Sequence, residues 1–314
     1  MKSRLQHSKL IVFFLASRPK FLAASAAPVL VGSVLAFAFT GVFHPMLFVL
    51  AVLAIMLLHA GANIANDYFD HTSGNDWANR NPTPFSGGRR YIQVGILSPK
   101  QTLLAAWVAL AAGSAVGAVI VLWTRSVFIL ALGLIGLLGG YFYTAAPVRL
   151  GYRCVGEFVI AMLFGLLPVY GSYYLQTGTI DAVPILPACI VSILIFLVIL
   201  VNEFPDAAAD VAVGKKTLVV RFGVPASAWI YKVAIVASYV IAAAMLVCQQ
   251  MFFVGLFYLL TLPIAIIAIK AANEKDLATP GQYRASQITV LLHTIGALTI
   301  TAGLLVTALH STAM

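Results

Sequence analysis

Six of the ten acidic residues in this 314-residue chain gather in two short clusters. The members are Asp67, Asp70 and Asp76 in the first cluster, and Glu203, Asp206 and Asp210 in the second. In each cluster an asparagine stands four residues before an aspartate, at Asn66 and at Asn202. Residues three and four apart share one face of a helix. We therefore expect two helix ends that each carry a stripe of carboxylate and amide oxygens.

Oxygen-rich stripes of this kind indicate a divalent-cation site. Mg²⁺ prefers oxygen ligands and usually binds through one or two carboxylates together with the phosphates of a substrate. Two facing acid stripes can hold two Mg²⁺ ions that bridge a diphosphate. Nearby cations can cover the remaining phosphate oxygens. Basic residues follow both clusters: Arg80, Arg89 and Arg90 after the first, and Lys215, Lys216 and Arg221 after the second.

The elements that carry these stripes must be membrane-spanning helices. Hydrophobic residues make up 61% of the chain and charged residues only 9%, which excludes an ordinary soluble domain. A spanning helix needs about 20 mostly apolar residues. Nine such stretches occur, at roughly 21–42, 46–65, 101–123, 126–144, 155–176, 183–203, 226–247, 251–270 and 286–308. The expected fold is an all-α bundle of nine transmembrane helices in a single domain over residues 1–314.

The distribution of basic residues predicts how this bundle is oriented. Lys and Arg accumulate in cytoplasmic segments, and with a cytoplasmic N-terminus 18 of the 19 basic residues lie inside, leaving only Arg125 outside. Both acid clusters then face the cytoplasm, in active-site loops at 66–100 and 202–225, and residues 1–18 form an interfacial segment. Basic juxtamembrane segments suit anionic headgroups, so the partner of this surface is the lipid bilayer and no nucleic acid is implied.

The organic part of the substrate has to suit apolar surroundings, and an isoprenoid diphosphate does. Its ionisation leaves an allylic cation, which must be kept from water and stabilised by aromatic faces. Aromatic residues near the loops are Tyr68, Phe69, Phe85, Tyr91, Tyr141 and Tyr143. Among them Tyr143 is our candidate for substrate contact, although interfacial tyrosines also form aromatic belts without such a role.

Several blocks resemble the UbiA superfamily of intramembrane prenyltransferases. These are nine-helix proteins that join isoprenoid diphosphates to aromatic acceptors with Mg²⁺ and two aspartate-rich motifs. The stretch "NDYFDHTSGND" is similar to the first motif and "NEFPDAAADVAVGKKTLVVRFG" to the second. Within the superfamily, "RPKFLAASAAPVLVG", "NPTPFSGGRR" and "YTAAPVRLGYRCVGE" most resemble the 1,4-dihydroxy-2-naphthoate prenyltransferase branch.

The resemblance implies roles for individual residues. The main metal and diphosphate ligands would be Asn66, Asp70, Asp206 and Asp210, joined by Asp67, Asp76 and Asn202. The diphosphate would also be contacted by Lys215, Arg90 and one of Arg149 and Arg153. The third acid of the first motif is Asp76, beyond Gly74, as in the naphthoate branch. Glu203 and Pro205 depart from the "NNYRD" usual in that branch, and Arg89 replaces a serine.

The expected function is therefore that of a Mg²⁺-dependent prenyltransferase in the inner (plasma) membrane, with its active site facing the cytoplasm. It would transfer a polyprenyl group to a small aromatic acceptor, 1,4-dihydroxy-2-naphthoate, with decarboxylation to demethylmenaquinone. Another acceptor of the superfamily, such as 4-hydroxybenzoate, homogentisate or a tetrapyrrole, is the alternative. A cation transporter fits the sequence less well, because transport sites usually lie near the midplane of the membrane. A purely structural role, in which the acids only anchor the helix ends, also fits less well. His59 and His293 fall within spans and are interpreted as packing residues.

Overall fold

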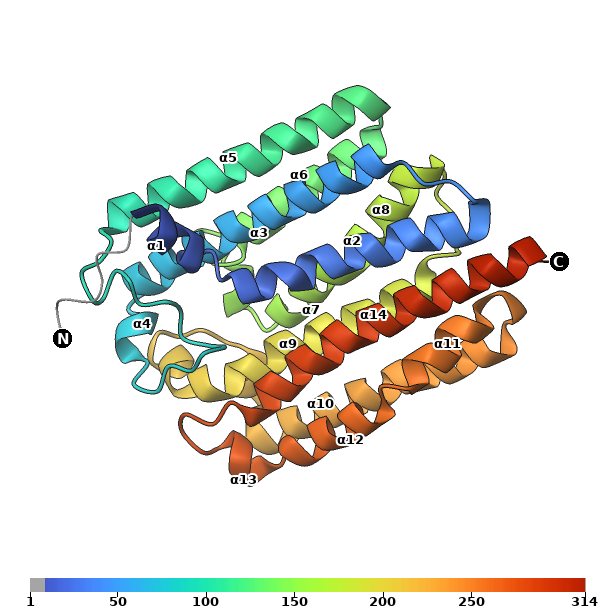
Figure 1. Ribbon diagram of the computed structural model, residues 1–314. Coiled ribbons are helices and arrows are strands. Elements are labelled where there is room, and N and C mark those ends of the chain that lie inside the picture. The colour runs from blue at the N-terminus through green and yellow to red at the C-terminus, as the bar shows by residue number, and fades with distance from the viewer. Residues whose placement is uncertain (1–8, 314) are drawn as a thin grey trace.

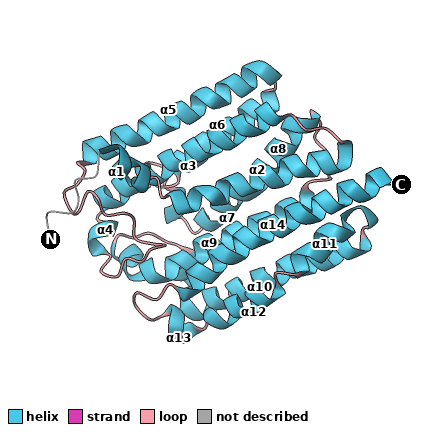
Figure 2. Cartoon of the chain, in the orientation of Figure 1, coloured by secondary structure: helices cyan, strands magenta, loops and turns pink. Residues whose placement is uncertain are grey.

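The structure is a computed structural model, and it describes residues 9–313. Helices and the loops between them make up this part of the chain, and it contains no strand (Figure 2). The long helices run roughly parallel or antiparallel to one another in one bundle (Figure 1). The helices are α1 (Lys9–Ala16), α2 (Pro19–Thr40), α3 (Pro45–Ser73), α4 (Asn75–Ala78), α5 (Pro99–Thr124), α6 (Val127–Phe142), α7 (Gly156–Ala161), α8 (Leu167–Thr177), α9 (Ile185–Ala212), α10 (Leu218–Val247), α11 (Phe252–Leu259), α12 (Leu262–Ala271), α13 (Glu274–Leu277) and α14 (Arg284–Ala313).

All nine predicted apolar stretches are helical, but they do not all qualify as straight spans. A π-helical turn, Met162–Leu166, joins α7 to α8 in one span. Within residues 9–313, seven helices are long and apolar enough to cross a membrane, and the number is eight if the pair α11 and α12, bent by 51°, counts as one span. The apolar α6 has 16 residues, about 24 Å at 1.5 Å per residue, against a hydrocarbon core of about 30 Å. Nine spans and a cytoplasmic N-terminus therefore stay predictions.

The two helices that carry the acid clusters extend well past the predicted spans. The third helix, α3, continues to Ser73, so that its acid stripe is helical, and ends at Gly74, whose φ of 84° suits a residue without a Cβ. The break lets the chain turn at once into α4, which carries Asp76. In the same way α9 continues through Pro205 to Ala212. Both acid stripes thus project beyond the apolar part of the bundle, at the end where α1, α4 and α13 lie (Figure 1).

Close packing between helices is achieved largely at glycines. In lipid there is little hydrophobic drive to bring helices together, so small residues that allow close backbone approach are favoured at interfaces. Gly32 of α2 lies against Val169 and Ser172 of α8, and Gly303 of α14 lies against the backbone of Val254 in α11. The buried leucines and valines of α9 lie at the centre of the main core cluster. This packing holds α9, and hence the second acid stripe, in the middle of the bundle.

Substitution of Gly32 tests the close contact between α2 and α8. A Cβ there would overlap the carbonyl oxygen of Val169 and the hydroxyl of Ser172. We expect Gly32→Ala to destabilise the protein by about 1–3 kcal/mol through overpacking. Gly117→Ala in α5, where nothing lies within 4 Å of the new Cβ, should be neutral or stabilising by about 0.5–1 kcal/mol. Thermal denaturation in detergent checks this, and equal midpoints for the two variants would contradict the packing.

Candidate active site

The two acid clusters meet across the end of the bundle, as their sequence predicts. Asn75 donates a hydrogen bond from Nδ2 to Oδ1 of Asp210 at 2.8 Å. Asn79 donates from Nδ2 to Oδ1 of Asp206 at 2.7 Å, and the backbone N–H of Gly87 donates to Oδ2 of the same carboxylate at 3.1 Å. The segment that follows the first cluster is therefore fastened to the second cluster by three hydrogen bonds.

A cavity of about 200 Å³ lies between the clusters. Seven of the predicted site residues line it: Asn66, Asp70, Tyr143, Asn202, Asp206, Asp210 and Lys215. Apolar side chains from α7 and α9, including Ile160 and Ile195, line its inner part. The cavity therefore changes from strongly polar at the acid end to apolar deeper in the bundle.

Several buried oxygens on the wall of this cavity have no hydrogen-bond donor, among them Oδ1 of Asp70, Oδ2 of Asp210 and Oδ1 of Asn202. A buried polar atom without a partner costs about 1–3 kcal/mol, so their presence from both motifs at one cavity fits a cation. Within the described residues no group of three or more His, Cys, Asp or Glu side chains is arranged to hold a metal ion by itself. Mg²⁺ sites in general take water and substrate phosphates as further ligands.

Asp67 and Asp76 lie behind the cavity and do not line it. Arg18 forms an ion pair with Asp67, and Gln93 donates from Nε2 to Oδ2 of Asp76 at 2.8 Å. A Cβ at Gly88, which has a φ of +67°, would lie within 3.1 to 3.3 Å of both carboxylates. Burial, and then the negative charges of Asp70 and Asp67, raise the pKa of Asp76 to about 7. These two acids thus form a separate, tightly packed group beside the cavity.

Lys215 reaches the cavity because backbone hydrogen bonds fix its segment both to the end of α9 and to the loop that carries Cys154. Its backbone N–H donates to the carbonyl of Asp210 at 2.8 Å, and the N–H of Cys154 donates to the carbonyl of Lys216 at 2.6 Å. Its Nζ then lies 3.3 Å from Oδ1 of Asp210. Burial lowers the pKa of this ammonium, but the Asp210 and Asp70 carboxylates outweigh burial and raise the pKa well above its usual value. Lys215 is therefore a permanent positive charge in the site.

The three predicted arginines lie elsewhere. Arg90 donates to the carbonyl of Asn79 at 2.8 Å and so supports the residue that binds Asp206. Arg149 lies over the ring of Tyr152, 5.4 Å from its centroid, and Arg153 donates to the carbonyl of Val148 at 2.5 Å. None of the three is among the described residues that line the cavity. The sequence gives no indication of side-chain direction in the loops that carry these arginines.

Arg18 is a site residue that the motif spacing did not identify. It lines the cavity, and its Nε is buried without a hydrogen-bond partner. It stands in a left-handed conformation just before Pro19, where α2 begins. Sequence reasoning counted it only as one of many basic residues near the N-terminus. Its place directly before the first apolar stretch, in "SRPK", is the signal that could have separated it from the others.

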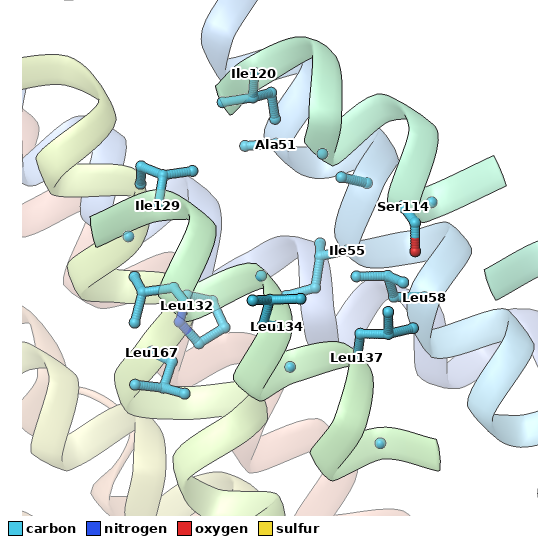
Figure 3. A pocket seen from close by; sticks show the side chains of 18 of the residues that line it. Ala51, Ile55, Leu58, Ser114, Ile120, Ile129, Leu132, Leu134, Leu137 and Leu167 are labelled. Carbon is cyan, nitrogen blue, oxygen red and sulfur yellow. The ribbon is translucent and has the colours of Figure 1, made fainter. Parts of the chain in front are cut away.

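A second cavity, of about 430 Å³, lies next to the first. Its walls come from α3, α5, α6 and α8, and Figure 3 shows side chains such as Ile55, Leu137 and Leu167 facing it. Almost all of its lining is aliphatic. The two cavities share four lining residues, His59, Ala62, Gly140 and Phe164, which we call the neck. A polar cavity that adjoins an apolar one suits an amphiphilic ligand with a charged head and a long tail.

This chain is similar in sequence and in fold to several known proteins. The model of the UbiA prenyltransferase family matches residues 25–292. A 1,4-dihydroxy-2-naphthoate octaprenyltransferase of Haemophilus influenzae is 33% identical over 70% of this chain and 72% of that protein. A 2-carboxy-1,4-naphthoquinone phytyltransferase of Synechocystis is 26% identical over 92% of this chain and 91% of that protein. The structure of a UbiA homolog from Archaeoglobus fulgidus, bound to GPP and Mg²⁺, has the same fold, with a TM-score of 0.70 at 16% identity over 94% and 99% of the two chains.

A comparison of two arginines tests which cations belong to the site. We expect Arg18→Leu to weaken the binding of inorganic diphosphate with Mg²⁺ by about tenfold or more, because a charged donor to phosphate is lost and Asp67 loses its partner. Arg153→Leu, which removes an exposed side chain bonded to backbone carbonyls, should change the affinity by less than about twofold. Isothermal titration calorimetry measures both. An equal loss in the two variants would place the diphosphate near the 147–153 loop instead.

Proposed function

This chain belongs to the UbiA prenyltransferase family, and we propose that it transfers a polyprenyl group from an isoprenoid diphosphate to 1,4-dihydroxy-2-naphthoate. The ring carbon that bears the carboxylate would bond to the prenyl carbon as diphosphate leaves, and loss of carbon dioxide from the adduct would then give demethylmenaquinone in its reduced, quinol form. The observation that carries this proposal is the set of unpartnered oxygens from two facing acid motifs, on the wall of a cavity that adjoins an apolar one. The names of the relatives supply the acceptor.

The acid end of the cavity would bind the diphosphate. Asp70, Asp210 and Asn202 would hold two Mg²⁺ ions, which when bound neutralise the leaving diphosphate. Asp206 belongs to the same ligand set, and its oxygens already accept from Asn79 and Gly87. Asp67 and Asp76, which do not line the cavity, would support the site from beside it, Asp67 by holding Arg18 in place. Lys215 and Arg18 would donate to phosphate oxygens, and both charges are already balanced by carboxylates when the substrate is absent.

The inner end of the same cavity would protect the allylic cation. Its walls include Ile160, Phe164 and Ile195, which keep water away from the reacting carbon. Tyr143 lines the cavity, and its ring packs against two neighbouring glycines, because a Cβ at Gly151 or Gly156 would lie within 2.9 to 3.1 Å of that ring. A tyrosine face fixed in this way can stabilise a cation at close range.

The apolar cavity beyond the neck would hold the rest of the prenyl chain. Three glycines on its walls, Gly117, Gly133 and Gly136, have nothing within 4 Å of the position that a Cβ would take. The space therefore opens at these backbones. Gly136 lies about 6 Å further along α6 than Gly140 of the neck, at 1.5 Å per residue. A long chain would pass it, whereas a short one would not reach it.

The orientation in the membrane follows from the charges. We place the acid end on the cytoplasmic side of the inner membrane, because 18 of the 19 basic residues then lie in cytoplasmic segments. The bent pair α11 and α12 and the short α6 would be the eighth and ninth spans. Anionic lipid headgroups would surround the basic segments at that face.

Incubation of the purified protein with Mg²⁺, geranylgeranyl diphosphate and a panel of aromatic acids tests the function. We expect 1,4-dihydroxy-2-naphthoate to be prenylated, with a product mass that lacks carbon dioxide. Asp70→Asn and Asp210→Asn should each lower the rate by about 100-fold or more, because stabilisation of the leaving group is lost. Asp181→Asn, which changes an acid on the 178–184 connection between α8 and α9, serves as the control and should keep the wild-type rate. Prenylation at an undiminished rate by both site variants, or only of another acceptor, would contradict the proposal.

A substitution at Gly136 tests the path of the prenyl chain. Gly136→Phe should lower the rate with geranylgeranyl diphosphate by about tenfold or more, because the ring would fill the cavity beyond the neck. The rate with geranyl diphosphate should change by less than about twofold, since two isoprene units do not extend that far. Leu138→Phe is the matched control, because Leu138 is exposed on the same helix and does not line the cavity. Equal effects on both substrates would show that the chain takes another route.

A further inference from the structure

His59 occupies a position that simple packing does not explain. It lies on α3 in the neck, so it lines both the polar and the apolar cavity. The other neck residues are Ala62, Gly140 and Phe164, and His59 is therefore the only member of the neck with a polar side chain. It also continues the stripe of Asn63, Asn66 and Asp70 along the same helix face, since these positions are separated by four, three and four residues.

Only one of the two ring nitrogens of His59, Nδ1, has a hydrogen-bond partner among the described residues. Nδ1 is hydrogen-bonded to Oγ of Ser25 at 2.5 Å, and Ser25 is completely buried. The ring packs against Phe164, with centroids 4.6 Å apart and an interplanar angle of 49°. Nε2 makes no hydrogen bond to any described residue, yet it is not among the buried polar atoms that lack a partner. It is therefore accessible from the cavities.

A polar ring in this position is costly unless a ligand uses it. Polar groups within a membrane bundle are expensive and usually functional, and a hydrocarbon tail passing the neck offers Nε2 no partner. The prenyl chain itself has no hydrogen-bonding groups. The aromatic acceptor does have them, on the ring that must lie beside the prenyl chain during the reaction. A hydroxyl of that acceptor would satisfy Nε2.

We propose that His59 binds the aromatic acceptor, through a hydrogen bond between its Nε2 and a phenolic hydroxyl, and that Ser25 positions the ring for this contact. The proposal rests on the proposed function, because it requires an aromatic acceptor. His59 lies seven residues from Asn66, about 10 Å along the helix. An acceptor held at His59 therefore extends its ring back towards the acid end, where the prenyl carbon attached to the diphosphate lies.

The kinetics of His59→Phe test this contact, because the substitution keeps an aromatic ring against Phe164 and removes only the polar atoms. The KM for the acceptor should rise by about tenfold or more, as expected when a site loses its hydrogen bond to a substrate hydroxyl. The KM for geranylgeranyl diphosphate should change by less than about twofold. His59→Gln should recover part of the loss, and Ser25→Ala should raise the acceptor KM by less than His59→Phe does, because the ring remains but is less well oriented.

His293→Phe is the matched control. His293 is also a buried histidine within a helix, and its Nε2 has no hydrogen-bond partner, but it lines neither cavity. Both KM values should stay within about twofold of wild type, since no substrate contact is lost. Mg²⁺-dependent binding of inorganic diphosphate by each variant shows whether the acid end has remained folded.

The outcomes separate this inference from the function on which it depends. If the wild-type protein prenylates an aromatic acceptor and His59→Phe leaves the acceptor KM unchanged, or raises only the KM for the prenyl diphosphate, the acceptor contact is wrong. If the variant is inactive but binds diphosphate normally, a direct titration with the acceptor decides, and undiminished binding overturns the proposal. A wild-type protein that prenylates no aromatic acceptor would overturn the proposed function itself, and this inference with it.

Discussion

Buried carboxylates in an apolar bundle need compensating hydrogen bonds or charges, and much of this structure supplies them. Removing a charge from water is costly unless it is paired. Asp206 is satisfied by Asn79 and Gly87, which fastens the loop after α4 to α9. Arg18 neutralises Asp67 and thereby ties the start of α2 to α3. The segments around the acid end are therefore ordered by the charges that they compensate.

The carboxylates beside the cavity and those on its wall differ in how their charge is compensated. Asp67 and Asp76 are enclosed by Arg18, Gly88 and Gln93. On the wall of the cavity, by contrast, Asp70 and Asp210 each have one oxygen bonded and one without a donor. Because an unpaired buried oxygen is unfavourable, such gaps mark the surface at which a cation and its substrate lower the energy of the site.

The body of the bundle provides a second contrast, between close packing and open space. Where glycines lie between helices, as at Gly32 and Gly303, a neighbouring backbone fills the space. Where Gly117 and Gly136 line the apolar cavity, nothing does. The same residue type therefore serves either to bring two helices together or to leave room for a chain. His59 lies where the open space meets the polar cavity, and its contacts differ from those of a packing residue.

Much was determined by the sequence alone: a helical membrane bundle, nine apolar helical stretches, and two acid motifs at one end that face each other. These follow from hydrophobic runs, from the spacing of like residues along a helix and from the scarcity of charge, all of which are local properties. The family followed from the motifs themselves. Only the tertiary structure decided which side chains share the cavity. Loops do not constrain side-chain direction by periodicity, so Lys215 and Arg18 reach the site while Arg90, Arg149 and Arg153 do not. The neck at His59 likewise exists only because helices distant in sequence pack against one another.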